Sequence, residues 1–588
     1  MTNRHAGRVL PLLCLLCFII PVSPDQSGQR ISGRHHACLM QEPSHAVAFV
    51  QAAIHVKKHI DVDETCSLCF GRGSTSSSPG DAVRVGLISM MRAVTSTDIR
   101  QLLLCWSLAS IGMGSLVLGL FKWSLWKQTP ASSSNSAPKK RSAYTWPLIW
   151  ARLVTTVTSM AEGYGAGCLS GAHLMFDRDL NLSASQSAFV MSVAQFAMAV
   201  GAPFGAVLAD RWGRLTALAL CYVTMVVGAL LMGFAASFPA LCIGRIMEAI
   251  GMGSSMCVVT TYMTEVSPSD IRGQLPSLEE PLINLGFLLS YVVNWVFAGA
   301  ANGWRWMLGL GCVLPGLMLW PLLLGLPPES PRFLLSQGER GKAERELATL
   351  VDDEEAEEML SAWTSEPESH IVPWSQVLWP DDPAAWRSLV AGVGVMSLQM
   401  LSGNSVVVVY PTTIFAEEMG VNAANLFSVL MSISRLLTTV PILFMIDTVG
   451  RRRLLLCSLG GMTLACILIG VFFSAGTSAL PWKVCTFLLF SVFYCVGAGP
   501  VAWVYTGEVM DTSVRSKGMS LAVVIARVYG GCLLLAYPSI SSRIGIGSFF
   551  MILAVFNFVG WSFIMLSVPE TKGTPLEEMR NHFKCSQH

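Results

Sequence analysis

The sequence predicts an all-α membrane protein in which about twelve transmembrane helices form two bundles of about six each. Its 588 residues are 52% hydrophobic and only 13% charged, and the mean hydropathy is +0.54. A soluble domain has about 25% charged residues. Apolar blocks such as Leu218 to Phe234 and Leu454 to Phe473 have the length that a helix needs to cross a bilayer. A charged signature also occurs twice along the chain, which indicates two related halves.

The apolar blocks from residue 148 onward are the predicted spans. They begin near residues 148, 186, 216, 239, 275, 304, 387, 423, 452, 481, 516 and 546. Basic residues gather in alternate loops, as at Arg211 and Arg214, Arg272, Arg451 and Arg515. Cytoplasmic loops carry the excess of basic residues, so these loops are predicted to be cytoplasmic.

The chain is predicted to have seven segments. They are a signal peptide at 1–24, a polar extension at 25–101, a candidate extra transmembrane helix at 102–123, a first bundle at 146–326, a cytoplasmic helical linker at 327–386, a second bundle at 387–567 and a cytoplasmic tail at 568–588.

Composition and motifs argue against several classes of function. The formal net charge of +1 gives no basic excess for nucleic acid, and the chain lacks the HExxH and phosphate-loop motifs. Cys66 and Cys69 form a single CxxC pair, which is weak evidence for a metal site. We therefore expect no enzyme activity, no metal and no cofactor, apart from protons as a candidate coupling ion.

The duplicated signature appears after the second and the eighth predicted spans. Asp210-Arg-Trp-Gly-Arg214 recurs as Asp447-Thr-Val-Gly-Arg-Arg452. In a later loop of each half, an acid precedes a base by seven residues, as Glu265 with Arg272 and Glu508 with Arg515. Transporters that move two halves about a central site are built from such repeats.

Several further motifs occur in order along the chain. They are Gly163-Tyr-Gly-Ala-Gly-Cys-Leu-Ser-Gly-Ala172, Arg245 with Gly251 and Gly253, Pro328-Glu-Ser-Pro-Arg332, Gln399-Met-Leu-Ser-Gly403, Gly499-Pro-Val-Ala-Trp503 and Pro569-Glu-Thr-Lys-Gly573. With these motifs the region from Trp146 to Lys572 resembles the sugar porter family of the major facilitator superfamily. The resemblance implies alternating-access transport of a monosaccharide or a polyol.

The resemblance also implies a charged gate at the cytoplasmic helix ends. Asp210 with Arg211 and Arg214, Glu265 with Arg272, Glu329 with Arg332, and Glu508 with Arg515 are expected to bridge the two bundles, together with Asp447 and Arg451. Exposed ion pairs contribute only about 0 to 1 kcal/mol each. Such a network would bias the equilibrium between two states without locking it.

The cargo site is expected on the seventh and tenth spans. Gln399, Ser402, Asn404 and Ser405 supply donors and acceptors for hydroxyl groups. Trp503 resembles the family's tryptophan that stacks on the sugar ring.

Three ionisable residues lie inside predicted spans, where each is a functional hypothesis by default. Glu280 is early in the fifth span, Arg435 is in the eighth and Arg527 is in the eleventh. These positions resemble the polyol/monosaccharide branch of the sugar porters. We expect Glu280 to pair with Arg435 or Arg527, with cargo hydroxyls exchanging into that network; a purely structural ion pair is the alternative.

The driving force is left open between two mechanisms. Proton-driven family members carry an aspartate after Gly-Tyr in the first span, where this chain has Gly165. Arg245 remains, and Glu162 or Glu248 is a candidate replacement for its partner. Facilitated diffusion is slightly favoured, and proton symport is the alternative.

A non-transporting sugar sensor and an organic-acid carrier are rival functions. The expected partners are a small sugar or polyol and the lipid bilayer, without nucleic acid, and the chain is expected to act as a monomer. The plasma membrane is the favoured location, with an organelle membrane as the alternative.

Overall fold

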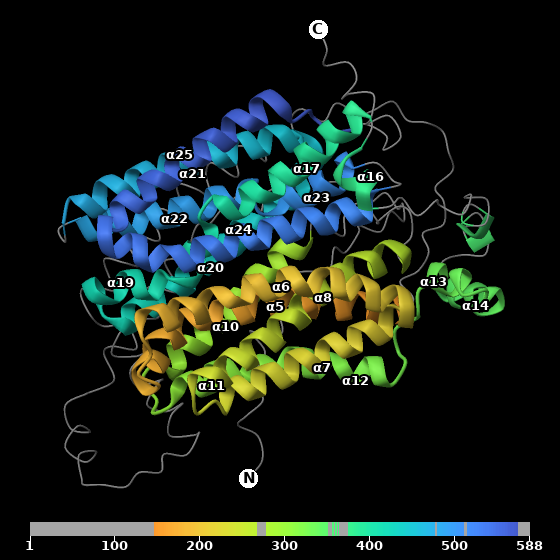
Figure 1. The fold of residues 1–588 in the computed structure, drawn as a ribbon, viewed down its shortest axis with the longest axis horizontal. Helices are drawn as coiled ribbons and strands as arrows, with labels where there is room; N and C mark the ends of the chain where they lie inside the picture. Colours follow the sequence, from red (N-terminus) through yellow and green to blue (C-terminus); the bar gives the residue numbers. More distant parts are fainter. Residues whose placement is uncertain are drawn as a thin grey trace, which may run out of the picture. The chain divides into compact units, whose positions relative to one another are not determined.

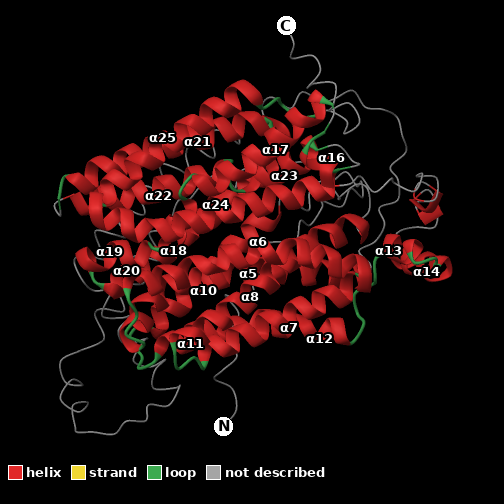
Figure 2. Cartoon of the chain, in the orientation of Figure 1, coloured by secondary structure: helices red, strands yellow, loops and turns green. Residues whose placement is uncertain are grey.

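The computed structural model describes residues 146–266, 278–350, 356–357, 359–361, 363, 374–380, 382–476, 479–510 and 514–573. All of these residues belong to one compact unit, Ser77–His588. The described part is helical and contains no strand (Figures 1 and 2). The predicted segments 1–24, 25–101 and 102–123, with Cys66 and Cys69, lie outside the described residues.

The first half contains a series of long helices that is coloured orange to green in Figure 1. They are α5 (Trp146–Asp179), α6 (Ala184–Trp212), α7 (Arg214–Gly233), α8 (Phe238–Val266), α10 (Glu279–Phe297) and a last span built from α11 (Gly303–Gly309), the 3₁₀ turn Leu310–Cys312 and α12 (Val313–Leu323). Three short helices follow: α13 (Pro331–Ser336), α14 (Arg340–Leu350) and α16 (Trp374–Leu378).

The second half, coloured teal to blue, repeats this order with two broken spans. It comprises α17 (Pro383–Leu401), α18 (Asn404–Val409), α19 (Pro411–Met419), α20 (Val421–Val449), α21 (Arg451–Ser474), α22 (Leu480–Val496), α23 (Pro500–Val509), α24 (Arg515–Ile544) and α25 (Ile546–Ser567). The breaks fall at Gly403 and Gly499, where the glycines of the QMLSG and GPVAW motifs interrupt the helices.

Eleven spans of the described part are long and apolar enough to cross a membrane. Helix α5 is the remaining long helix; it spans 34 residues and packs against α8 and α10. Its sequence is less apolar because it carries Glu162, His173 and several glycines and serines. With α5 the described helices make up the predicted twelve-span, two-bundle fold, which is therefore confirmed.

Two glycines allow sharp turns at equivalent places in the two halves. Gly213 lies between α6 and α7 with a φ of 92°, and Gly450 lies between α20 and α21 with a φ of 101°. Side chains other than glycine rarely adopt this left-handed region. Each turn places the N-terminus of the following helix against a carboxylate, which is described below.

Candidate functional site

The buried Arg435 guanidinium lies at the contact between the two halves. Arg435 is on α20 and is 1% exposed. Its Nε donates to Asn284 Oδ1 at 2.8 Å, and its Nη1 donates to Asn404 Oδ1 at 2.8 Å. Its Nη2 lies 3.7 Å from Glu280 Oε1. Because Glu280 and Asn284 are on α10 of the first half, Arg435 joins the halves through one acid and one amide.

Glu280 and Gln399 meet at the break between α22 and α23. A Cβ atom on Gly499 would lie 3.0 Å from the Glu280 carboxyl, so the glycine leaves room for that carboxylate. The Gln399 amide donates to the Gly499 carbonyl at 3.1 Å. The structure therefore brings the sequence-predicted residues Glu280 and Asn404 against Arg435, while Gln399 is bonded to Gly499 beside Glu280. Of the two bases proposed for Glu280, its ion-pair partner is Arg435.

Two polar atoms of this cluster have no hydrogen-bond partner among the described residues. They are Gln399 Oε1 and Arg435 Nη2, and both atoms are buried. A buried unsatisfied group costs about 1 to 3 kcal/mol. One acceptor and one charged donor are thus left for a bound group.

The two predicted serines of the broken seventh span have different surroundings. The Ser402 hydroxyl donates to the Gln399 carbonyl at 2.7 Å and accepts from the Asn404 N–H at 3.4 Å, both within the turn at the helix break. The Ser405 hydroxyl faces the Met400 sulfur at 3.7 Å. Ser402 is therefore placed to hold the helix break, whereas Ser405 lies beside a soft apolar neighbour.

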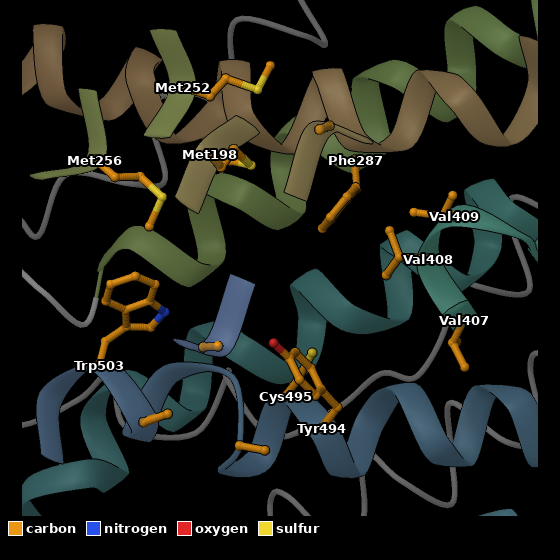
Figure 3. Packing of buried hydrophobic residues seen from close by; sticks show 14 of the residues in the cluster. Met198, Met252, Met256, Phe287, Val407, Val408, Val409, Tyr494, Cys495 and Trp503 are labelled. Atoms are coloured by element: carbon orange, nitrogen blue, oxygen red, sulfur yellow. The ribbon is translucent and has the colours of Figure 1, made fainter. Parts of the chain in front are cut away.

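Trp503 presents a large apolar ring to the contact between the halves. It is on α23 and is 7% exposed. Figure 3 shows Met256 of α8 pointing towards the indole, with Met198 and Met252 on the same side as Met256. Methionine side chains adapt to irregular shapes. An aromatic face opposite flexible thioethers suits the apolar face of a small ring or chain.

A second arginine reaches from the second half into the first. Arg527 Nη2 on α24 lies 2.5 Å from Glu162 Oε1 of α5, and it also lies 2.9 Å from the Met256 sulfur. Its Nη1 lies 3.4 Å from Gln195 Oε1 of α6. Arg527 therefore pairs with Glu162, and both inter-half ion pairs of the described residues combine an acid of the first half with an arginine of the second.

Arg245 has a carboxylate partner on its own helix. Its Nη1 lies 2.5 Å from Glu248 Oε2, and both side chains are 3% exposed. A Cβ atom on Gly165 would lie 3.3 Å from Glu248 Oε1. The Glu248 carboxylate thus borders the space beside Gly165, together with the Met252 methyl group, whereas Glu162 pairs elsewhere.

Hydrogen bonds join the halves at the end opposite to the basic loops. Ser170 donates to Thr412 at 3.0 Å, and one turn later His173 Nδ1 lies 3.2 Å from Thr413 Oγ1. Tyr291 donates to the Val408 carbonyl at 2.7 Å. These contacts connect α5 and α10 with α18 and α19, so the structure is closed at this end, which is called the outer end after its predicted position.

At the end of the first half that carries the basic loops, called the inner end after its predicted position, Arg214 and Glu329 brace three segments. Arg214 Nε and Nη2 donate to Glu265 at 2.8 and 2.9 Å, which joins α7 to α8. Asp210 lies 3.6 Å from the same guanidinium. Glu329 accepts from the backbone N–H of Arg214 and Leu215 at the N-terminus of α7. Burial raises the pKa of the Glu329 carboxyl, while these N–H groups and that of Ser330 act in the opposite direction.

The second half repeats this brace nearly atom for atom. Arg451 Nη2 lies 2.8 Å from Glu508 and 2.7 Å from Asp447. Glu570 accepts from the backbone N–H of Arg451 and Arg452, as Glu329 does in the first half. The Thr571 hydroxyl donates to Glu508 at 2.6 Å, and Ser330 donates to Glu265 at the same distance.

The carboxylates of the predicted gate have partners that chain spacing did not suggest. Glu265 is bonded to Arg214, Glu508 to Arg451, and Glu329 to helix N–H groups. The pairs described here join helices of the same half. The packing of one helix end against another selects these partners, and this packing cannot be read from the spacing of residues along a single loop. Arg272 lies outside the described residues, and Arg211 is exposed.

Replacing Arg214 tests whether the brace stabilises the first half. The change Arg214→Ala would leave Glu265 without its cation in a site where both side chains are about one-tenth exposed. Breaking a buried pair costs about 3 to 5 kcal/mol. We expect a clear loss of thermal stability in detergent, measured beside Arg211→Ala, which removes an exposed cation at the same helix end. Equal melting temperatures for the two variants would contradict this role.

Some residues of the site were not predicted from the sequence. Asn284 donates to Thr439 at 3.0 Å while it accepts from Arg435, and the Tyr494 ring lies 4.9 Å from the Arg435 guanidinium. Gln195 contacts Arg527 of the second half, and His173 contacts Thr413 of the second half and Ser187 of α6. An asparagine one turn after Glu280 inside a span was the available signal for Asn284.

Comparisons with known proteins identify the family. Residues 115–583 match the family described as "Sugar (and other) transporter". The chain is similar to Polyol transporter 5 of Arabidopsis thaliana, with 30% identity over 487 residues that cover 78% of this chain and 89% of that protein. It is also 30% identical over 424 residues to the glucose transporter GlcP of Staphylococcus epidermidis, covering 71% of this chain and 93% of the relative.

The fold is similar to that of the xylose transporter XylE from E. coli. In a partially occluded inward-open conformation that structure has a TM-score of 0.64 and 23% identity, and the match covers 73% of this chain and 99% of XylE. The predicted class, a transporter and not an enzyme, is thereby confirmed. The chain belongs to the sugar (and other) transporter family, and it is a sugar or polyol transporter with the major facilitator fold.

Proposed function

We propose that this chain carries a polyol or a monosaccharide across its membrane by alternating access, with the cargo bound around Gln399, Arg435 and Trp503. The observation that carries the proposal is that two buried atoms, Gln399 Oε1 and Arg435 Nη2, have no hydrogen bond among the described residues. Hydroxyl groups of the cargo can donate to Gln399 Oε1 and accept from Arg435 Nη2. Trp503 then covers the apolar side of the cargo.

The charged neighbours favour a polyol over a plain hexose. Glu280 and Arg435 form a buried ion pair, and hydrogen bonds to charged groups contribute about 1.5 to 3 kcal/mol each. An open-chain polyol can rotate successive hydroxyls to meet such groups. Relatives named as polyol transporters support this choice, whereas the glucose transporter GlcP supports the hexose alternative.

The contacts that join the halves support alternating access. The outer hydrogen bonds of Ser170 and His173 with Thr412 and Thr413 must separate when the outer side opens. Each is an ordinary polar bond with a net contribution of about 0.5 to 1.5 kcal/mol. The cost of opening is therefore within reach of the binding free energy of a small cargo.

The position of Glu248 makes proton symport a second candidate mechanism, beside facilitated diffusion. Gly165 alone favours facilitated diffusion, since the expected aspartate is missing. The Glu248 carboxylate lies beside Gly165 and pairs with Arg245, so a buried acid and its arginine are still present. Protonation of Glu248 would release Arg245 and change the charge of the first half.

Transport by the purified protein in liposomes tests the cargo. We expect uptake of labelled mannitol that is competed by inositol and by glucose, and not by quinate. Strong competition by quinate would favour an organic-acid carrier, and specific binding without uptake would favour a sensor.

The same vesicles, with and without an imposed pH gradient, compare symport with facilitated diffusion. Plasma-membrane location is proposed separately and is checked by imaging a fluorescent fusion.

A further inference from the structure

A basic cavity lies at the inner end of the second half, outside the cargo site. Its volume is about 470 Å³. It is formed where α20 and α25 end and α21 begins. The lining residues are Val449, Arg452, Arg453, Leu456, Met565, Glu570 and Lys572.

The charge of this cavity is positive. Three cations, Arg452, Arg453 and Lys572, line it together with one acid, Glu570. The Glu570 carboxylate already accepts from backbone N–H groups, including those of Arg452 and Lys572. Its negative charge therefore lies against the N-terminus of α21. Among the described residues, no other acid lines the cavity to neutralise the three cations.

The first half shows that the brace does not need these cations. In the two braces Arg214 is equivalent to Arg451, and Glu329 is equivalent to Glu570. Counting on from these pairs, the places of Arg452, Arg453 and Lys572 are taken in the first half by Leu215, Thr216 and Pro331. The same hydrogen bonds form there without them. The three cations are thus an addition of the second half.

The basic side chains retain donors for a ligand. Arg452 Nη2 donates to the Met565 carbonyl at 2.5 Å, but its buried Nε has no partner among the described residues. Lys572 Nζ donates to the Thr448 carbonyl at 2.6 Å and has further donor positions. Arg453 is exposed. Guanidinium groups bind phosphate oxygens well because their donors form a planar fork.

The remaining wall of the cavity is apolar and continues onto an exposed helix surface. Val449, Leu456 and Met565 line the cavity, and Met565 is 48% exposed. The next residue, Leu566, is 85% exposed at the end of α25. A soluble anion gains nothing from contact with such an apolar surface, whereas the acyl chains of a lipid pack against it favourably.

We propose that this cavity binds the headgroup of an anionic phospholipid of the cytoplasmic leaflet, with the phosphate at Arg452, Arg453 and Lys572. The lipid's glycerol and upper acyl chains then lie against Met565 and Leu456. Basic pockets at the cytoplasmic side of transmembrane helices recognise anionic headgroups in this way. The proposal is independent of the cargo.

Lipid binding by the full chain tests this assignment. The protein is placed in vesicles of phosphatidylcholine with or without phosphatidylserine, extracted in mild detergent, and assayed for retained lipid by native mass spectrometry. The test variant is Arg452→Leu with Arg453→Thr, which installs the residues of the first half. The matched control is Arg340→Leu with Arg345→Thr, which removes two exposed arginines from α14.

We expect the wild-type protein and the control to retain phosphatidylserine, and the test variant to bind it about thirtyfold more weakly, from the usual contribution per basic side chain. Equal retention by test and control variants overturns the proposal. Displacement of the lipid by inorganic phosphate at low concentration also overturns it, because the ligand is then a soluble anion. If the double variant does not fold, the exposed Lys572→Gln change is measured in the same assay, with the same two readings.

Discussion

Glu280→Gln is expected to reduce the initial rate of cargo uptake about tenfold or more while the protein remains in the membrane. The carboxylate is 4% exposed, lies 3.7 Å from Arg435 and closes the site beside Gly499. Hydrogen bonds to charged groups contribute about 1.5 to 3 kcal/mol, and about 1.4 kcal/mol is a factor of ten in affinity. Glutamine keeps the size of the side chain, so the packing against Gly499 is preserved.

Two further variants separate transport from folding in this experiment. Glu417→Gln is the control, since it makes the same chemical change at an exposed position of α19. The double change Glu280→Gln with Arg435→Gln removes the unpaired buried cation, so it should recover protein yield without recovering uptake. Uptake by Glu280→Gln at the wild-type rate would exclude Glu280 from the cargo site. Recovery of uptake in the double variant would show that the pair is only structural.

Glu248→Gln is expected to abolish proton-driven accumulation and to leave equilibrium exchange of cargo intact. For one proton per cargo, a gradient of one pH unit supports about a tenfold accumulation, since one unit corresponds to about 1.36 kcal/mol. Glutamine cannot lose and regain the proton, so the variant should reach equal concentrations on both sides. The measurement is the steady-state uptake of labelled cargo with and without the pH gradient.

Glu162→Gln is the matched comparison, because Glu162 pairs with Arg527 instead of Arg245. We expect this variant to accumulate cargo more slowly and to keep its response to pH. Loss of accumulation in Glu162→Gln alone would move the coupling acid to the Arg527 pair. A wild-type protein that never accumulates cargo would establish facilitated diffusion, in agreement with Gly165.

The sequence alone determined the helical membrane fold, because span length and hydropathy follow directly from the thickness of the hydrocarbon core. Observed helices begin at 184, 238 and 451, within two residues of the starts expected from the apolar blocks. The duplicated Asp/Gly/Arg signature likewise indicated two related halves. Arg435 and Arg527 were found from the sequence because a charge inside an apolar block stands out.

Only the tertiary structure decided which charges meet. Glu280 pairs with Arg435, Glu162 with Arg527 and Glu265 with Arg214, although chain spacing allowed other partners. An ion pair across two helices depends on their rotation and relative height, and neither quantity appears in the hydropathy of one segment. For the same reason the basic cavity at Arg452 became visible only when the end of α25 was placed beside the start of α21.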